Sequence, residues 1–213
     1  MKHGVGIIIT ALALISTFVG TVGCSKSVAH AVYMDYEGVN AAVSKSTHGL
    51  SLTLALNAKA YQPGSEISII VDEQNTLSTE NRVRISYDWR LNGLVTSTFC
   101  NTNNYPFGVA VYSGDYPADK LAKLKPLYIS DPRIMYHCIA GPTNYFTYIF
   151  KPLSDIIWLR ADGAELSPMK DEIKIHGYWT QSCEFGNFEP GVYTVAAGDE
   201  WGTLAVVHFT VTE

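Results

Sequence analysis

Residues 50–56, LSLTLAL, alternate leucine with small or polar side chains. This period of two is typical of a β-strand with one buried face, because successive side chains of a strand point to opposite sides of the sheet. Residues 61–64, YQPG, follow as a turn, since proline fixes φ and glycine accepts a positive φ. Ile67, Ile69 and Val71 then alternate in the same way. The stretch predicts two consecutive strands joined by a turn.

Short runs of the same kind continue toward the C-terminus, so strands are expected at residues 83–87, 94–99, 107–112, 145–150, 156–159, 173–179, 192–197 and 204–211. Residues 114–138 contain several prolines and read as a long excursion, in which residues 118–124 fit one or two helical turns. Roughly nine or ten short strands favour an all-β fold, an immunoglobulin-like antiparallel β-sandwich, over an α/β fold. One domain is expected over residues 48–213.

A resemblance supports this fold in the last third of the chain. Residues 188–195 (FEPGVYTV), 198–202 (GDEWG) and 208–211 (HFTV) resemble the closing hairpin of a group of uncharacterised secreted prokaryotic β-sandwich proteins. Together with residues 50–72 they are similar, more distantly, to the intracellular proteinase inhibitor-like domain. The resemblance implies an immunoglobulin-like sandwich and implies no activity.

In this hairpin the alternation predicts which residues are buried. Tyr193 and Val195 are expected to point into the sandwich, and Gly198 and Gly202 are expected to bracket the connecting loop. Trp201 is expected to fold back over the edge of the sandwich.

The N-terminus has the features of an export signal. A basic start at Lys2 is followed by an uncharged, largely apolar run over residues 4–23. The run ends in small residues before Cys24, which resembles the lipobox of prokaryotic lipoproteins and implies lipid attachment at Cys24. An uncleaved membrane anchor and a cleaved secretory signal are the alternatives, because about 20 apolar residues suffice to span a bilayer.

Residues 1–23 are therefore predicted to be a lipoprotein-type signal or membrane anchor, and residues 24–47 a tether. The chain is expected in the cell envelope, extracytoplasmic and membrane-anchored through its N-terminus only. Without Lys2, 14 Lys and Arg residues stand against 20 Asp and Glu residues, a formal charge of −6. This balance argues against nucleic acid as a partner, which requires basic clusters.

The three remaining cysteines allow one internal disulfide in an oxidising exterior. Cys100 with Cys138 is the first expectation, because each follows an apolar run beside an irregular stretch. Cys183 is the alternative partner of Cys138.

Candidate metal sites are weak. Asp199 and Glu200 in the hairpin loop are a calcium candidate, but no spaced acidic pattern surrounds them, and loop acids are usually solvated. Zinc-ligand residue types occur without ligand spacing at His137, Cys138, His176 and Cys183. No cofactor is expected.

No catalytic motif is found, and His208 lies inside an alternating strand, where a packed or edge histidine is expected. The chain is therefore not expected to be an enzyme. The expected function is a membrane-tethered extracytoplasmic binding or structural module for an unknown protein or glycan at the cell surface. Two alternatives remain: a proteinase inhibitor presenting a loop at residues 101–105 or 114–138, and a subunit of a surface filament or envelope complex.

Overall fold

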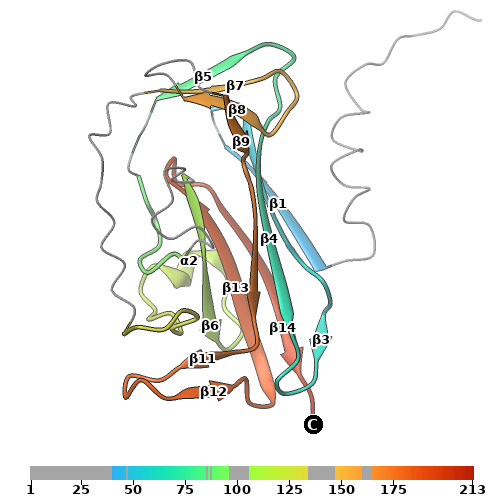
Figure 1. The fold of residues 1–213 in the computed structure, drawn as a ribbon, viewed down its shortest axis with the longest axis vertical. Helices are drawn as coiled ribbons and strands as arrows, with labels where there is room; N and C mark the ends of the chain where they lie inside the picture. Colours follow the sequence, from blue (N-terminus) through green and yellow to red (C-terminus); the bar gives the residue numbers. More distant parts are fainter. Residues whose placement is uncertain are drawn as a thin grey trace, which may run out of the picture.

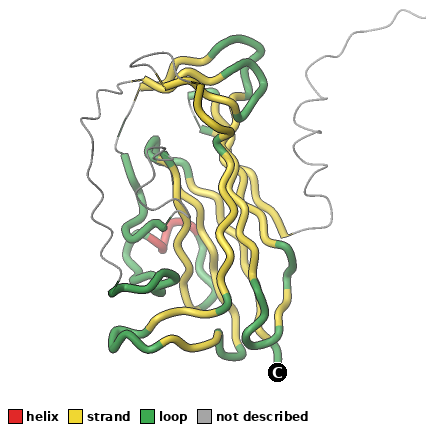
Figure 2. Tube along the Cα trace, viewed as in Figure 1, coloured by secondary structure: helices red, strands yellow, loops and turns green. Residues whose placement is uncertain are grey.

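The computed structural model describes residues 40–46, 48–84, 86, 88–95, 106–133, 147–159 and 165–213. These residues are mostly β-strands, with one short helix, α2 (Ala118–Leu121) (Figures 1 and 2). The predicted all-β fold is confirmed. The strands are β1 (Asn40–Lys45), β2 (Leu50–Leu56), β3 (Ala60–Tyr61), β4 (Ile67–Asn75), β5 (Asn81–Arg84), β6 (Phe107–Ser113), β7 (Thr147–Phe150), β8 (Ile156–Leu159), β9 (Glu165–Pro168), β10 (Lys170–Ile175), β11 (Gly177–Trp179), β12 (Phe185–Asn187), β13 (Gly191–Asp199) and β14 (Leu204–Val211).

Two four-stranded sheets form the sandwich. One sheet has the order β1-β2-β4-β10 and the other has the order β3-β14-β13-β6. The strand pairs are antiparallel apart from the two-residue parallel pairing of β3 with β14. A continuous apolar core lies between the sheets, because the alternating faces of β2, β4, β13 and β14 all point inward. This is the arrangement expected of an immunoglobulin-like sandwich.

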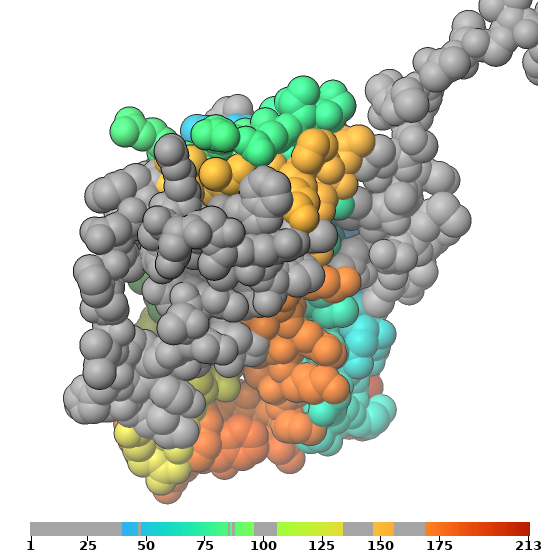
Figure 3. All heavy atoms as spheres, turned by 45° about the horizontal axis from the view of Figure 1, so that its top comes forward, coloured from blue at the N-terminus to red at the C-terminus, as the bar shows by residue number. Residues whose placement is uncertain are grey.

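Two smaller sheets lie at opposite ends of the sandwich (Figure 1). The sheet β5-β7-β8-β9 covers one end, where β5 and β7 pair and lie side by side (Figures 1 and 3). The hairpin of β11 and β12 forms the other end. These two ends carry the unusual features of the molecule.

The predicted strand positions are confirmed at β2, β8 and β14, but several bounds differ. β1 lies within residues 24–47, which the sequence predicted as tether, so residues 40–45 belong to the sheet. Its sequence lacks a clear period because most of its side chains are only partly buried, on both faces of the strand. The predicted strand at residues 173–179 is two strands, β10 and β11, which separate at His176.

β4 also differs from expectation, because it continues through residues 72–75. The alternation of Ile67, Ile69 and Val71 predicts a strand that ends at Val71, because the sequence that follows, DEQN, is polar. In the structure, Glu73 and Asn75 are fully buried and stay in phase with Ile69 and Val71. A charged segment thus forms the end of a core strand.

The closing hairpin is confirmed, but Gly198 does not bracket its loop, because it lies inside β13 and pairs with Leu204 of β14. Tyr193 and Val195 are buried, and the Tyr193 ring stacks on Phe209 with 5.0 Å between ring centroids. Trp201 folds back and packs edge-on against Tyr148, with ring centroids 5.5 Å apart. Gly202 has a φ of 82°, which L-residues with a Cβ rarely adopt.

The helix found at residues 118–121 agrees with the predicted helical turns in the excursion after β6. No helix in the described ranges is long and apolar enough to cross a membrane.

Candidate functional site

Exposed aromatic side chains gather at the end formed by β11 and β12. Phe185 on β12 is 50% exposed, and Tyr128, in the segment that follows α2, is 38% exposed. Trp179 at the end of β11 lies between them: its backbone N–H donates to the Tyr128 carbonyl at 2.7 Å, and its ring packs against Phe185 with centroids 5.2 Å apart. These three aromatic residues together with Arg133 are called the aromatic surface below.

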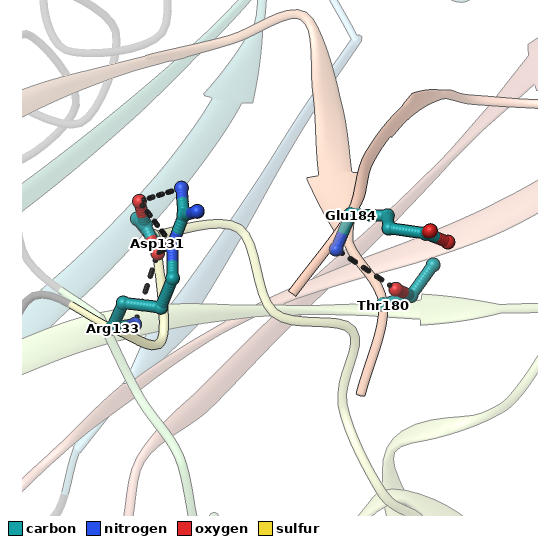
Figure 4. A network of polar contacts seen from close by, with 4 residues as sticks. All are labelled: Asp131, Arg133, Thr180 and Glu184. Carbon is teal, nitrogen blue, oxygen red and sulfur yellow. Dashed lines mark hydrogen bonds and ion pairs between the residues drawn. The ribbon is translucent and has the colours of Figure 1, made fainter. Parts of the chain in front are cut away.

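Arg133 completes the aromatic surface. Its guanidinium lies over the Trp179 ring, 4.8 Å from the ring centroid, within the range of a cation–π contact. Asp131 holds the guanidinium in this position, because Arg133 Nη2 and Nε donate to its two carboxylate oxygens at 2.7 and 2.9 Å (Figure 4). The Arg133 side chain is 57% exposed, so it remains accessible to a partner. The same pairing lowers the pKa of Asp131 below its ordinary value.

The hairpin that carries the aromatic surface has a tight turn at residues 180–184. The Glu184 backbone N–H donates to Thr180 Oγ1 at 3.2 Å, and the Thr180 N–H donates to the Glu184 carbonyl at 2.8 Å (Figure 4). Gly177 allows the two strands to approach closely, since a Cβ at this position would lie 2.1 Å from the Gly186 carbonyl oxygen. The local sequence therefore fixes the positions of Trp179 and Phe185.

The opposite end of the sandwich contains three buried carboxyl groups, Glu73, Asp199 and Glu200, which are called the acidic cluster below. Their side chains are 0%, 1% and 3% exposed. Glu73 lies on the inner face of β4, and Asp199 ends the inner face of β13, so the two come from opposite sheets. Neither Glu73 carboxyl oxygen has a hydrogen-bond partner among the described residues, and the same is true of Asp199 Oδ2 and Glu200 Oε1.

Asp199 organises the hairpin loop. Its Oδ1 accepts hydrogen bonds from the backbone N–H groups of Trp201 at 2.9 Å and Thr203 at 2.7 Å. The expectation that the loop acids are solvated is therefore wrong for both Asp199 and Glu200. Sequence patterning alone placed them in a loop, but the loop folds inward with Trp201 and covers them.

Burial has a clear effect on the acidic cluster. It raises the pKa of Glu73 well above the ordinary value, and the charges of Asp199 and Asp72 raise it further. Burial also raises the pKa of Glu200 to about 7, although a hydrogen bond from the Ser86 backbone acts in the opposite direction. The pKa of Asp199 is raised by burial, while its hydrogen bonds from Thr203 and Trp201 and the charge of His48 lower it.

An open cleft of about 380 Å³ reaches Trp201 of the hairpin loop. Trp201, Ser86, His48 and Arg84 are among its lining residues. The cleft gives water a route to the loop that covers the carboxyl groups.

The predicted covalent sites fall mostly outside the described residues. Cys24, the predicted lipid-attachment site, and Cys100 and Cys138, the predicted disulfide, are not among them. Cys183, the alternative disulfide partner, is described and is a free, partly buried thiol with a φ of 61° in the turn at residues 180–184.

The structure does not gather the other predicted metal-ligand residues. His176 Nε2 lies 3.7 Å from Glu66 Oε2 on the surface. His208, which the sequence predicts to be a packed or edge residue of a strand, lies on β14 with its Nε2 3.0 Å from Asp115 Oδ1. His137 and Cys138 lie outside the described residues. Within the described ranges, no group of three or more His, Cys, Asp or Glu side chains is arranged to hold a metal ion.

Comparison with known proteins gave no similarity to report: no family model, no curated protein and no solved structure matches this chain. The features that bear on function therefore lie at the two ends of the molecule.

The sequence predicted neither the burial of Glu73 nor the aromatic surface. The signal for Glu73 was present, because it continues the period-two set of Ile67, Ile69 and Val71. The aromatic surface joins residues 128 and 133 to residues 179 and 185, which no local pattern connects.

Proposed function

We propose that this chain is an extracytoplasmic binding module, tethered to a membrane by its N-terminus, whose aromatic surface binds a protein partner. The observation that carries the proposal is the exposure of Phe185 and Tyr128 beside a fixed Trp179–Arg133 pair. Tryptophan, tyrosine and arginine are the residues most often found at the energetic centre of protein interfaces. Large apolar rings exposed together on an otherwise polar surface are also typical of a contact site.

The geometry favours a protein over a glycan. A sugar stacks on an open aromatic face, but the Trp179 ring is already covered by the Arg133 guanidinium and contacted by Phe185. What remains accessible is a mixed surface of the Phe185 and Tyr128 rings, the Arg133 cation and the neighbouring Glu184 carboxylate. Such a surface matches the polar rim and apolar centre of a protein interface.

The tether belongs to the same proposal. The basic start at Lys2, the apolar run and Cys24 support export and anchoring, and an extracytoplasmic module requires both. Lipid attachment at Cys24 is the proposed form of the anchor, which metabolic fatty-acid labelling of the parent chain and of Cys24→Ala tests. Equal labelling of the two chains contradicts it.

The alternatives have less support. An edge strand that mediates filament assembly is expected to be apolar and flat, whereas β10 presents Lys170, Glu172 and Lys174 outward, and such charges oppose edge-to-edge pairing. A proteinase inhibitor would present a loop at residues 101–105 or 114–138. Residues 101–105 lie outside the described residues. In the second loop, the Leu127 N–H donates to the Val111 carbonyl of β6, so this part of the loop packs against the sheet.

Site-specific photo-crosslinking in the native envelope tests the proposal. A photoreactive residue is placed in the full chain at Phe185, at Tyr128 and, as a control, at Leu77. Leu77 is 42% exposed and lies near the opposite end of the sandwich. The expected result is the same cross-linked protein from Phe185 and Tyr128 and none from Leu77, with the yield reduced by Arg133→Ala. Equal cross-linking from all three positions, or cross-linking only to glycan, contradicts the proposal.

A further inference from the structure

The acidic cluster lies where four segments of the chain meet. The Glu200 backbone N–H donates to the Pro106 carbonyl at 2.8 Å, and the Glu200 carbonyl accepts from the Asp88 N–H at 2.7 Å. Trp201 Nε1 donates to the Arg84 carbonyl at 2.7 Å. The hairpin loop at residues 199–203 is thereby bonded to the end of β5, to the segment that follows it and to the start of β6. Whatever displaces this loop releases all three contacts together.

The buried carboxyl groups determine how firmly the loop can be held. A carboxylate without a hydrogen-bond partner is costly in a protein interior, whereas a protonated carboxyl group is far less so. Glu73 is fully buried, and neither of its oxygens is bonded within the described part of the chain. Glu200 has one such oxygen, Oε1. Both groups therefore favour the protonated form as long as the loop is closed.

The charged groups around the cluster do not offset this cost. On the same strand as Glu73, Asp72 adds a like charge, and Asp199 adds another from β13. His48, in the turn between β1 and β2, lowers the pKa of Asp199 through its charge interaction with that carboxyl group. Asp88 and Arg90 lie beside Gly202 on the outer side of the loop. The other charged side chains on neighbouring strands and turns are Arg82, Arg84, Lys151, Asp155, Lys170 and Asp171.

We infer that the acidic cluster is a proton-dependent lock: the loop at residues 199–203 stays bonded to Arg84, Asp88 and Pro106 while Glu73 and Glu200 hold protons, and loosens when they lose them. Loss of the protons places two negative charges next to Asp199 in the interior between the sheets. Repulsion and the demand of the carboxylates for water both push the loop outward. The cleft lined by Ser86 and Trp201 supplies that water.

The sign of the pH dependence follows from the direction of the shifts. Both groups bind a proton more tightly in the folded chain than in the unfolded chain, where the pKa is near 4.5. The folded state therefore loses stability as the pH rises above about 4.5. The loss from Glu200 is complete somewhat above its folded pKa of about 7, and Glu73, whose pKa burial raises well above its ordinary value, adds a loss of the same sign.

The test uses the full chain in detergent, with thermal unfolding at pH 5.5 and pH 8. The Tm of the parent chain is expected to be roughly 5–10 °C lower at pH 8. Glu73→Gln and Glu200→Gln each remove a titrating group while keeping its shape, so each is expected to reduce that difference. Glu189→Gln, at an exposed position near the other end of the molecule, is the control and is expected to leave the difference unchanged.

Hydrogen exchange in the parent chain locates the change and does not depend on any variant folding. After correction for intrinsic rates, the amides of Asp88, Asp199 and Glu200 are expected to lose protection between pH 5.5 and pH 8. The amides of Leu127 and Trp179, which are bonded at the aromatic end, are expected to keep it.

Two outcomes overturn the inference. One is a Tm and an exchange pattern that do not change with pH in the parent chain. The other is restoration of the Tm at pH 8 by added Ca²⁺ in the parent chain but not in Glu73→Gln, which assigns the cluster to a cation instead of protons.

Discussion

At the end of the sandwich covered by β5 and β7, carboxyl groups are buried and several of their oxygens have no hydrogen-bond partner within the described ranges. At the end formed by β11 and β12, aromatic rings are exposed while Arg133 and Asp131 satisfy each other. At the β5–β7 end, carboxyl groups lie in the interior, where apolar side chains are usual. At the β11–β12 end, aromatic rings lie on the surface, where polar side chains are usual. Between them the core is a regular apolar sandwich that needs no functional explanation.

This difference between buried carboxyl groups and exposed rings suggests a different role for each end. An interior with unsatisfied carboxyl groups has a stability that depends on conditions, because protons change its energy. An exposed surface of fixed rings changes little with conditions and offers area to a partner. The two proposals therefore assign a pH-dependent role to one end of the sandwich and a binding role to the other.

The largest effect is expected at the acidic end, from Asp199→Ala. The substitution leaves the N–H groups of Trp201 and Thr203 without their acceptor, and each buried donor left unsatisfied costs about 1–3 kcal/mol. The measurement is chemical denaturation at pH 5.5, below the folded pKa of about 7 of Glu200, where the repulsion between its carboxyl group and Asp199 is small. Asp199→Asn keeps the accepting oxygen and is expected to cost less. Equal costs for the two variants contradict the role of these hydrogen bonds.

A smaller, local effect is expected at the aromatic end, from Gly177→Ala. The added Cβ would meet the Gly186 carbonyl oxygen at 2.1 Å, so β11 and β12 must move apart, which for overpacking costs about 1–3 kcal/mol, felt mainly in the hairpin. Gly186→Ala in the partner strand is the matched control, because a Cβ there meets nothing within 4 Å. Hydrogen exchange of the Trp179 amide is expected to quicken in the first variant only. Faster exchange in both variants contradicts the close-approach argument.

The sequence predicted the sandwich because period-two patterning and turn chemistry act locally. β2 and β14 have the predicted bounds, and the hairpin places Tyr193 and Trp201 as expected. The bounds of β4 were missed because a run of polar residues ordinarily marks a loop. Glu73 follows the buried alternation, but hydrophobicity alone gives no reason to bury it.

The two ends were not predictable, for a different physical reason. The aromatic surface depends on Tyr128, which reaches Trp179 through an isolated bridge after a long excursion. The acidic cluster depends on the packing of β4 against the closing hairpin across the core. Contacts between residues so far apart in the chain leave no pattern in a single sequence.

The smallest effect on stability, and the most specific one on the aromatic surface, is expected from Arg133→Gln. Because the Arg133 side chain is 57% exposed, loss of its ion pair with Asp131 is expected to leave the Tm unchanged within measurement error. It uncovers the Trp179 ring, so acrylamide quenching of the Trp179 fluorescence, isolated by comparison with Trp179→Phe, is expected to rise.

Arg82→Gln is the matched control for this variant. Arg82 also forms an exposed ion pair, with Glu80 at 2.8 Å, and it lies on β5 at the opposite end of the sandwich. It is expected to change neither the Tm nor the quenching of Trp179. A drop in Tm with Arg133→Gln but not with Arg82→Gln makes Arg133 a structural residue, and the aromatic surface then loses its accessible cation as a binding group. An unchanged Tm together with increased quenching shows that Arg133 covers the Trp179 ring without stabilising the fold. That result supports a role for Arg133 in binding a partner.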